Sequence, residues 1–183
     1  MFEFDAAMTA WINNWAGQAP AIDAVVIGIS TAGVPLMVLA VALQWWLPRA
    51  DTAIRHVLIA AGLSFLLGLG INQLILLFIQ RARPYEADVT HLIIDRTVDF
   101  SFPSDHATAS FAIAAAFLVH GLSRRGFWFL AVALLIGLSR VYLGTHYVSD
   151  ILGGAATGFL AAAVVRLAYR ENTRLDRLVT GIF

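Results

Sequence analysis

Residues 54–79 read IRHVLIAAGLSFLLGLGINQLILLFI, a run in which Arg55 is the one charged residue. About 20 apolar residues in a helix cross a hydrocarbon core of ~30 Å, so this run predicts a transmembrane helix. The whole chain has the same character: 60% of its 183 residues are hydrophobic, 13% are charged and the mean hydropathy is +0.78. Ordinary soluble domains carry roughly 25% charged residues. The composition therefore excludes a water-soluble globule and indicates a membrane protein.

Four further apolar stretches have a length similar to that of the first. The five predicted spans are residues 22–47, 54–79, 104–122, 126–143 and 151–167. Residues 1–18 combine Trp11 and Trp15 with acids and amides, which suits an interfacial helix that lies on the membrane. The sequence thus predicts an all-α fold, a polytopic transmembrane helical bundle of about five spanning helices plus an N-terminal interfacial helix. It forms one domain, residues 1–183, with an outer loop at 80–103.

Arginine supplies all twelve basic residues, and the predicted loops share them unequally. Eight lie after the first span, after the third span or in the tail: Arg49, Arg55, Arg124, Arg125, Arg166, Arg170, Arg174 and Arg177. Four lie on the other side: Arg81, Arg83, Arg96 and Arg140. Because cytoplasmic loops collect basic residues, we expect the N-terminus outside and the C-terminus inside. A bacterial inner membrane is expected, with loop 80–103 on the periplasmic or extracellular side.

The composition also limits the possible cofactors and partners. The chain has no Cys, which excludes a disulfide framework and a thiolate metal site. Its formal net charge is zero, so no net field favours nucleic acid. With no carboxylate cluster to hold an ion, we expect neither a metal nor another cofactor.

Polar residues gather in three clusters at the predicted outer ends of the spans, at residues 80–84, 102–106 and 139–150. Ionisable side chains at the edge of a bilayer are costly, so a functional site is the first hypothesis for such positions. The candidate site residues are Arg81, Arg83, Ser104, Asp105, His106, Arg140, His146 and Asp150.

Each cluster taken alone also has a structural interpretation. Arg81 and Arg83 can anchor the chain to lipid phosphates, and Ser104 can begin a helix. His146 and Asp150 are four residues apart, which predicts one helix face and a hydrogen bond that fixes the imidazole tautomer. Three histidines lack comparable neighbours and are expected in loops or at the interface: His56, His91 and His120.

Taken together, the clusters predict a phosphate site. Arginine forks match phosphate oxygens, and a helix N-terminus adds amide donors and partial positive charge. One oriented histidine can attack phosphorus while a second protonates the departing oxygen. The alternative from another class is a transporter that uses His106, His146 and Asp150 as a proton relay. A relay of this kind requires polar residues across the whole bilayer.

The pattern Arg-Pro, Pro-Ser-x-His and Ser-Arg-x5-His-x3-Asp over residues 83–150 resembles the type 2 phosphatidic acid phosphatase superfamily. These are membrane lipid phosphatases related to vanadium haloperoxidases, and the hydropathy excludes a soluble haloperoxidase. The resemblance implies a phosphohistidine mechanism. In that mechanism His146 is the nucleophile, Asp150 orients it and His106 is the acid for the leaving group. The phosphate ligands implied are Arg83, Ser104 and Arg140.

The first motif departs from the usual family pattern at Leu76, where the family places Lys seven residues before the Arg of Arg-Pro. We expect Arg81, or the pair Asn72 and Gln73, to compensate. Arg-x-Arg-Pro-aromatic with Pro-Ser-Asp-His is similar to the bacitracin-resistance branch, the undecaprenyl diphosphate phosphatases of cell wall biogenesis. In this interpretation Arg81 and Asp105 also bind substrate, and Arg81 brings positive charge to the headgroup of a diphosphate.

Several lipids remain open as substrates, because phosphatidylglycerophosphate, phosphatidate and lipid A phosphate present headgroups similar to that of undecaprenyl diphosphate. In each case the lipid tail would stay in the bilayer while the headgroup rises between the arginines. Small residues let helices approach closely, so Gly153, Gly154 and Gly158 predict tight packing within the chain rather than a dimer contact.

Overall fold

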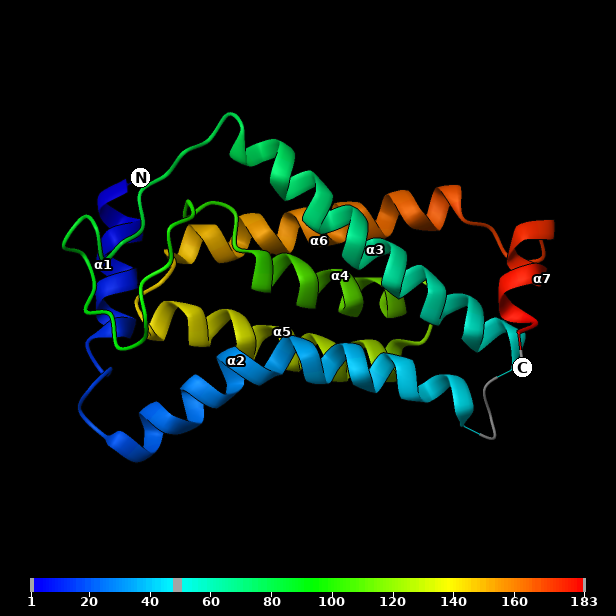
Figure 1. Cartoon of the computed structure of the whole chain (residues 1–183), viewed down its shortest axis with the longest axis horizontal. Helices are drawn as coiled ribbons and strands as arrows, with labels where there is room; N and C mark the ends of the chain where they lie inside the picture. Colours follow the sequence, from blue (N-terminus) through cyan, green and yellow to red (C-terminus); the bar gives the residue numbers. More distant parts are fainter. Residues whose placement is uncertain (1, 48–50, 183) are drawn as a thin grey trace.

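The computed structural model describes residues 2–47 and 51–182, and that part of the chain contains helices and no strand. The helices are α1 (Phe2–Asn13), α2 (Pro20–Leu43), η1 (Gln44–Trp46), α3 (Thr52–Leu76), α4 (Asp105–Val119), α5 (Ser123–Tyr142), α6 (Val148–Ala168) and α7 (Arg174–Thr180). The helices α2 to α6 run along one axis, α1 crosses one end of the bundle and α7 lies at the other end (Figure 1). The predicted all-α helical bundle is confirmed.

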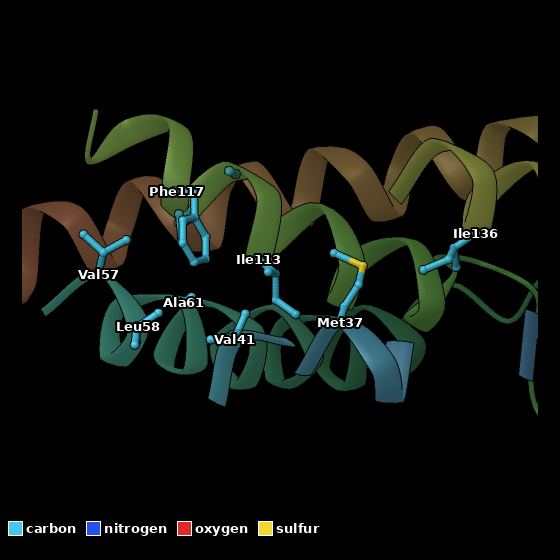
Figure 2. Packing of buried hydrophobic residues seen from close by; sticks show 11 residues of the cluster. Met37, Val41, Val57, Leu58, Ala61, Ile113, Phe117 and Ile136 are labelled. Carbon is cyan, nitrogen blue, oxygen red and sulfur yellow. The ribbon is translucent and has the colours of Figure 1, made fainter. Parts of the chain in front are cut away.

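Four segments are long and apolar enough to cross a membrane: Pro20–Trp46, α3, α5 and α6. The fifth predicted span, 104–122, contains α4, which has 15 residues. At 1.5 Å per residue this helix is about 23 Å long, shorter than a hydrocarbon core of ~30 Å. Helix α4 is instead the centre of the bundle, and 11 of its residues are buried. Figure 2 shows Ile113 and Phe117 of α4 in the hydrophobic core beside side chains of α2 and α3.

The ends of α3 determine where the polar segments start. Asp51 begins the helix, because its carboxylate accepts a hydrogen bond of 2.9 Å from the Ile54 N–H, as an N-cap residue does. The helix ends at Leu76, before the predicted end at residue 79. Residues 77–104, which contain the predicted outer loop, then return across the end of the bundle where α1 lies (Figure 1).

Glycines on α6 allow the backbones of α4 and α6 to touch. A Cβ atom at Gly154 would lie 2.6 Å from the Ser104 carbonyl oxygen, and one at Gly158 would lie 2.7 Å from the Ala112 nitrogen. A residue larger than glycine at either position would therefore collide with α4 unless the backbone moved. The predicted close packing within the chain is confirmed, and it fixes the position of Ser104 at the start of α4.

The two ends of the bundle differ in their arginine content. Figure 1 shows the start of α3, the α4–α5 turn, the end of α6 and α7 at one end of the bundle. That end of the bundle contains the larger of the two predicted groups of arginines. Arg49, which belongs to this group, lies outside the described residues. The chain termini also lie at opposite ends (Figure 1), as a bundle with an odd number of lengthwise helices requires.

The expectation that His56 lacks neighbours is wrong. His56 is fully buried on α3, with Nδ1 2.7 Å from a carboxylate oxygen of Asp176 on α7. Its ring stacks on Tyr169 at 4.5 Å between centroids and lies 5.3 Å from the ring of His120. His91 is exposed in the segment between α3 and α4, as expected. The His56 contacts join α3 to α7, a short helix that the sequence analysis did not predict.

Candidate active site

The three predicted polar clusters meet at the end of the bundle that α1 crosses. Arg83, in the segment between α3 and α4, has Nη1 3.2 Å from Nε2 of His146. The same Nη1 donates a hydrogen bond of 2.8 Å to the Thr145 carbonyl. At the start of α4, the Ser104 N–H donates to the Asp150 carbonyl at 3.1 Å. Residues far apart in the sequence thus form one continuous site.

Arg83 is buried, and Asp99 holds one edge of its guanidinium. Nη2 donates to the Asp99 carboxylate at 2.8 Å, and Nε donates to the Asp99 carbonyl at 3.0 Å. Burial opposes ionisation of Asp99, but the charge and hydrogen bond of Arg83 outweigh it and lower the pKa of this carboxyl. Asp99 was not predicted from the sequence. Its effect is to aim the other edge of the guanidinium at His146.

His146 lies in the junction between α5 and α6, and the structure corrects its predicted partner. The predicted shared helix face does not form, because α6 begins at Val148. The His146 Nδ1 lies 2.8 Å from the Ser101 carbonyl oxygen and 3.6 Å from the nearer oxygen of Asp150. A carbonyl only accepts hydrogen bonds, so Nδ1 carries the proton and the lone pair of neutral imidazole is on Nε2. Burial, helped by the Arg83 charge, lowers the pKa of His146 and favours this neutral form.

Asp150 is fully buried in the first turn of α6 and supports His146 indirectly. Its carboxylate accepts hydrogen bonds from the Tyr147 N–H at 2.8 Å and from the hydroxyl of Ser101. It also forms an ion pair of 2.7 Å with Arg81. The Ser101 that binds Asp150 through its side chain is the residue that binds His146 through its backbone. Asp150 therefore fixes the peptide that orients the imidazole.

Seven buried side-chain polar atoms lack a hydrogen-bond partner within the described residues, and two of them belong to the predicted phosphate ligands Ser104 and Arg140. The Ser104 hydroxyl is fully buried and makes no hydrogen bond there. Arg140 is buried, with Nη1 2.7 Å from the Ser30 hydroxyl and Nε unpaired. No carboxylate among residues 2–47 and 51–182 forms an ion pair with Arg140. A buried cation without an ion-pair partner and a buried hydroxyl without a hydrogen bond each favour the binding of an anion.

His106 stands in the first turn of α4, half-buried, and its side chain makes no hydrogen bond within the described residues. Because its ring has no hydrogen-bond partner there, it is available to a ligand. The predicted role of His106 as the acid for the leaving group stays a prediction.

The residues suggested as substitutes for the family Lys have other surroundings. Asn72 is buried on α3 and donates hydrogen bonds to Asp105 at 2.7 Å and to Thr108 at 2.8 Å. Gln73 is exposed, and Leu76 is the last residue of α3. Asn72 thus joins α3 to α4 and holds the Asp105 carboxylate. The predicted substrate-binding role of Asp105 stays a prediction.

Arg81 is paired with acidic groups on both sides. Nη1 donates to Asp150 at 2.7 Å and to the Ser149 hydroxyl at 2.6 Å, and Nη2 donates to Asp5 of α1 at 2.7 Å. The guanidinium also lies 3.7 Å from the centre of the Tyr147 ring. Its predicted role in substrate binding stays a prediction, and its contacts point toward Asp150.

Three residues of the site were not predicted from the sequence: Ser101, Asp99 and Asp5. The contact of Ser101 with His146 uses its carbonyl oxygen, which every residue has, so the residue type could not indicate that contact. Within residues 2–47 and 51–182, no group of three or more His, Asp or Glu side chains is placed to hold a metal ion.

Comparisons with known proteins agree with the geometry. The model of a family described as the PAP2 superfamily matches residues 56–174. The undecaprenyl-diphosphatase BcrC of Bacillus subtilis (strain 168) is 35% identical over 76% of this chain and 70% of its own length. The putative undecaprenyl-diphosphatase YbjG of Escherichia coli (strain K12) is 31% identical over 75% of this chain and 67% of its own length. The crystal structure of a transmembrane PAP2 type phosphatidylglycerolphosphate phosphatase from Bacillus subtilis superposes with a TM-score of 0.66 and 26% identity, over 94% of this chain and 87% of that one.

Proposed function

The chain belongs to the PAP2 superfamily and is a multi-pass membrane phosphatase, and on this premise we propose that it hydrolyses undecaprenyl diphosphate to undecaprenyl phosphate. The reaction would take place at the outer face of a bacterial inner membrane and serve cell wall biogenesis and bacitracin resistance. The proposal for the lipid is supported by the identity to two undecaprenyl-diphosphatases. It does not depend on Arg81, because both terminal nitrogens of that side chain already bind carboxylates.

The groups around His146 support the proposal that this residue attacks phosphorus. Its Nε2 faces Nη1 of Arg83, while Arg140 and the Ser104 hydroxyl supply unpaired donors from α5 and α4. A phosphoryl group in front of Nε2 would receive donors from all three residues. Donors that are aimed in advance at developing charge are usually the largest contribution to catalysis.

The proposed reaction has two steps. In the first, Nε2 of His146 attacks the terminal phosphorus, the bond to the bridging oxygen breaks, and His106 protonates the departing undecaprenyl phosphate. The Nδ1–H of the phosphohistidine continues to donate to the Ser101 carbonyl. In the second, His106 takes a proton from water, the water oxygen attacks phosphorus, the bond between phosphorus and Nε2 of His146 breaks, and inorganic phosphate leaves. His106 and His146 are thereby restored.

The orientation is proposed from the arginines. The end of the bundle with α7 holds the larger set, which the positive-inside rule assigns to the cytoplasm. The site end, with loop 80–103 and the N-terminus, would then face the periplasm or the cell exterior. A lipid carrier whose diphosphate is exposed on that face would reach the site without crossing the membrane.

A proton-relay transporter is not supported by the distribution of charge. The ionisable residues of the described helices α2 to α6 lie near the helix ends, and the stretches between Arg125 and Arg140 and between Asp150 and Arg166 contain none. A second lipid phosphatase function does have a specific observation in its favour. Hydrolysis of phosphatidylglycerophosphate is favoured by the similarity to the Bacillus subtilis phosphatase structure over most of both chains.

Phosphate release by the purified protein would test the proposal. The substrates are undecaprenyl diphosphate, phosphatidylglycerophosphate, phosphatidate and lipid A phosphate, each in mixed micelles at equal surface fraction. We expect the highest kcat/KM with undecaprenyl diphosphate and no release by His146→Ala. Faster hydrolysis of phosphatidylglycerophosphate would favour the second function. Activity of His146→Ala equal to that of the unchanged protein would refute the chemistry for every lipid.

A further inference from the structure

Helix α1 turns a polar face toward the active site. Asp5, Thr9 and Asn13 recur at intervals of four residues, which places them on one face of a helix. Thr9 and Asn13 are buried and Asp5 is half-buried. The other surface of the helix exposes large apolar side chains, namely Phe4, Met8 and Trp11. The helix therefore contacts the protein through polar groups, although an amphipathic helix packed on a hydrophobic core does the reverse.

The polar face binds the start of α6, where the first amide groups of a helix have no partner within the helix. The Ser149 N–H donates to the Asp5 carboxylate at 2.9 Å, and the Val148 N–H donates to the Thr9 hydroxyl at 3.1 Å. At the other end of α1, Asn13 donates to the carbonyl of Tyr142 at 2.7 Å. Helix α1 thus holds both sides of the α5–α6 junction that carries His146.

Asp5 also begins a chain of charged groups. Its carboxylate forms an ion pair of 2.7 Å with Nη2 of Arg81, and Nη1 of Arg81 forms one of 2.7 Å with Asp150. Burial opposes ionisation of Asp5, but its hydrogen bonds with Arg81 and Ser149 lower its pKa and keep it charged. Arg81 is therefore held between two carboxylates, one from α1 and one from α6.

The chain continues from Asp150 to the imidazole. The Asp150 carboxylate accepts from the Ser101 hydroxyl, and the Ser101 carbonyl accepts from Nδ1 of His146 at 2.8 Å. Each of these hydrogen bonds either involves a charged group or fixes the tautomer of the imidazole. A shift of Arg81 would therefore change the orientation of the His146 ring. A small misplacement of a catalytic group lowers the rate strongly.

We propose that Asp5 is a positioning residue of the active site, which acts through Arg81, Asp150 and Ser101 on the orientation of His146. The proposal rests on the role of His146 as nucleophile under the proposed function. It makes the N-terminal helix part of the catalytic apparatus, with its apolar surface directed away from the site. It also gives Arg81 a role that does not depend on whether the substrate carries one phosphate or two.

A double-mutant cycle tests this proposal with the full chain. The variants are Asp5→Ala, Arg81→Ala and the double variant, assayed with a soluble diphosphate, farnesyl diphosphate, and a soluble monoester, dihexanoyl phosphatidate. We expect Asp5→Ala to lower kcat by about tenfold and to leave KM within about twofold. In the Arg81→Ala background the same change is expected to have a much smaller effect, because the link through Arg81 is already broken and only the hydrogen bonds between Asp5 and Ser149 remain to be lost. Arg81→Ala is expected to lose the same factor with both substrates.

Glu3→Gln is the matched control, because Glu3 is an exposed acid in the same turn of α1, and its kcat is expected to equal that of the unchanged protein. Should Asp5→Ala fail to fold, Asp5→Asn has the same shape and removes only the charge. Losses that multiply in the double variant, or a change in KM alone, would overturn the proposal. A loss for Arg81→Ala confined to the diphosphate would instead assign Arg81 to substrate binding. His146→Ala, measured in parallel, reports separately on the proposed function.

Discussion

The carbonyl oxygen of Ser101 lies 2.8 Å from Nδ1 of His146, closer than the Asp150 carboxylate at 3.6 Å. A backbone oxygen therefore sets the tautomer of the imidazole, and the carboxylate holds that backbone in place. This division of roles differs from a direct Asp–His pair, and the two arrangements respond differently to substitution.

Asp150→Asn is expected to lower kcat/KM by about 10 to 100-fold, because the carbonyl still fixes the tautomer after the charge is lost. Ser101→Ala removes the hydroxyl that binds Asp150 and keeps the carbonyl, so we expect a loss of about tenfold or less. Ser64→Ala is the control, since that buried hydroxyl binds the Ala60 carbonyl within α3. Initial rates of phosphate release give these values. A loss for Asp150→Asn as large as that for His146→Ala would argue for a direct pair.

The pH dependence of the reaction provides a second prediction. The pKa of His146 is lowered from 6.5 by burial and by the charges of Arg83 and Arg140, against the opposing effect of Asp150. The nucleophile must be neutral, so activity is present above its pKa and falls as the pH drops through it. We therefore expect the acid limb of kcat/KM to lie below pH 6.5 once the titration of the substrate phosphate, followed by phosphorus NMR, has been taken into account. A limb above that pH would show that burial does not control the imidazole.

The sequence was sufficient for the fold class and for choosing polar residues that lie together at one end of the bundle, because both depend on local patterns. Apolar runs identified the helices α2 to α6, and the spacing around Arg83, Ser104 and His146 identified residues that the structure brings together. The pattern could not reveal that α4 is enclosed by its neighbours, since a buried helix and a lipid-facing helix are equally apolar. It also could not reveal Ser101, whose contact with His146 is made by the backbone, or Asp5, which reaches the site from another helix.

The orientation can be tested because the chain has no Cys. Ala87 is exposed in the segment between α3 and α4, and Ser123 is exposed at the start of α5. In intact cells we expect Ala87→Cys to react with a membrane-impermeant maleimide and Ser123→Cys to react only after the membrane is permeabilised. Ala87 is preferred to the adjacent Asp88, whose positive φ of 54° disfavours a substituted side chain. The opposite labelling pattern would place the active site in the cytoplasm.

The buried pair of His56 and Asp176, at the end opposite the active site, predicts a change in stability without a change in chemistry. Removal of one partner of a buried pair typically costs about 3–5 kcal/mol, because the other polar group stays buried. Asp176→Ala is therefore expected to lower the Tm in detergent while kcat at low temperature stays the same. Arg174→Ala, an exposed change on the same helix, is the control. An unchanged Tm for Asp176→Ala would mean that α7 adds nothing to the stability of the bundle.

The central claim is that His146 accepts the phosphoryl group from a lipid diphosphate. Rapid mixing of the purified protein with undecaprenyl diphosphate labelled with ³²P in the terminal phosphate, followed by an alkaline quench, tests it most directly. The account predicts label that is stable to base, labile to acid and located by peptide mapping on His146, and that is absent from the His146→Ala variant. Turnover of the substrate with no label on His146 at any mixing time would contradict it.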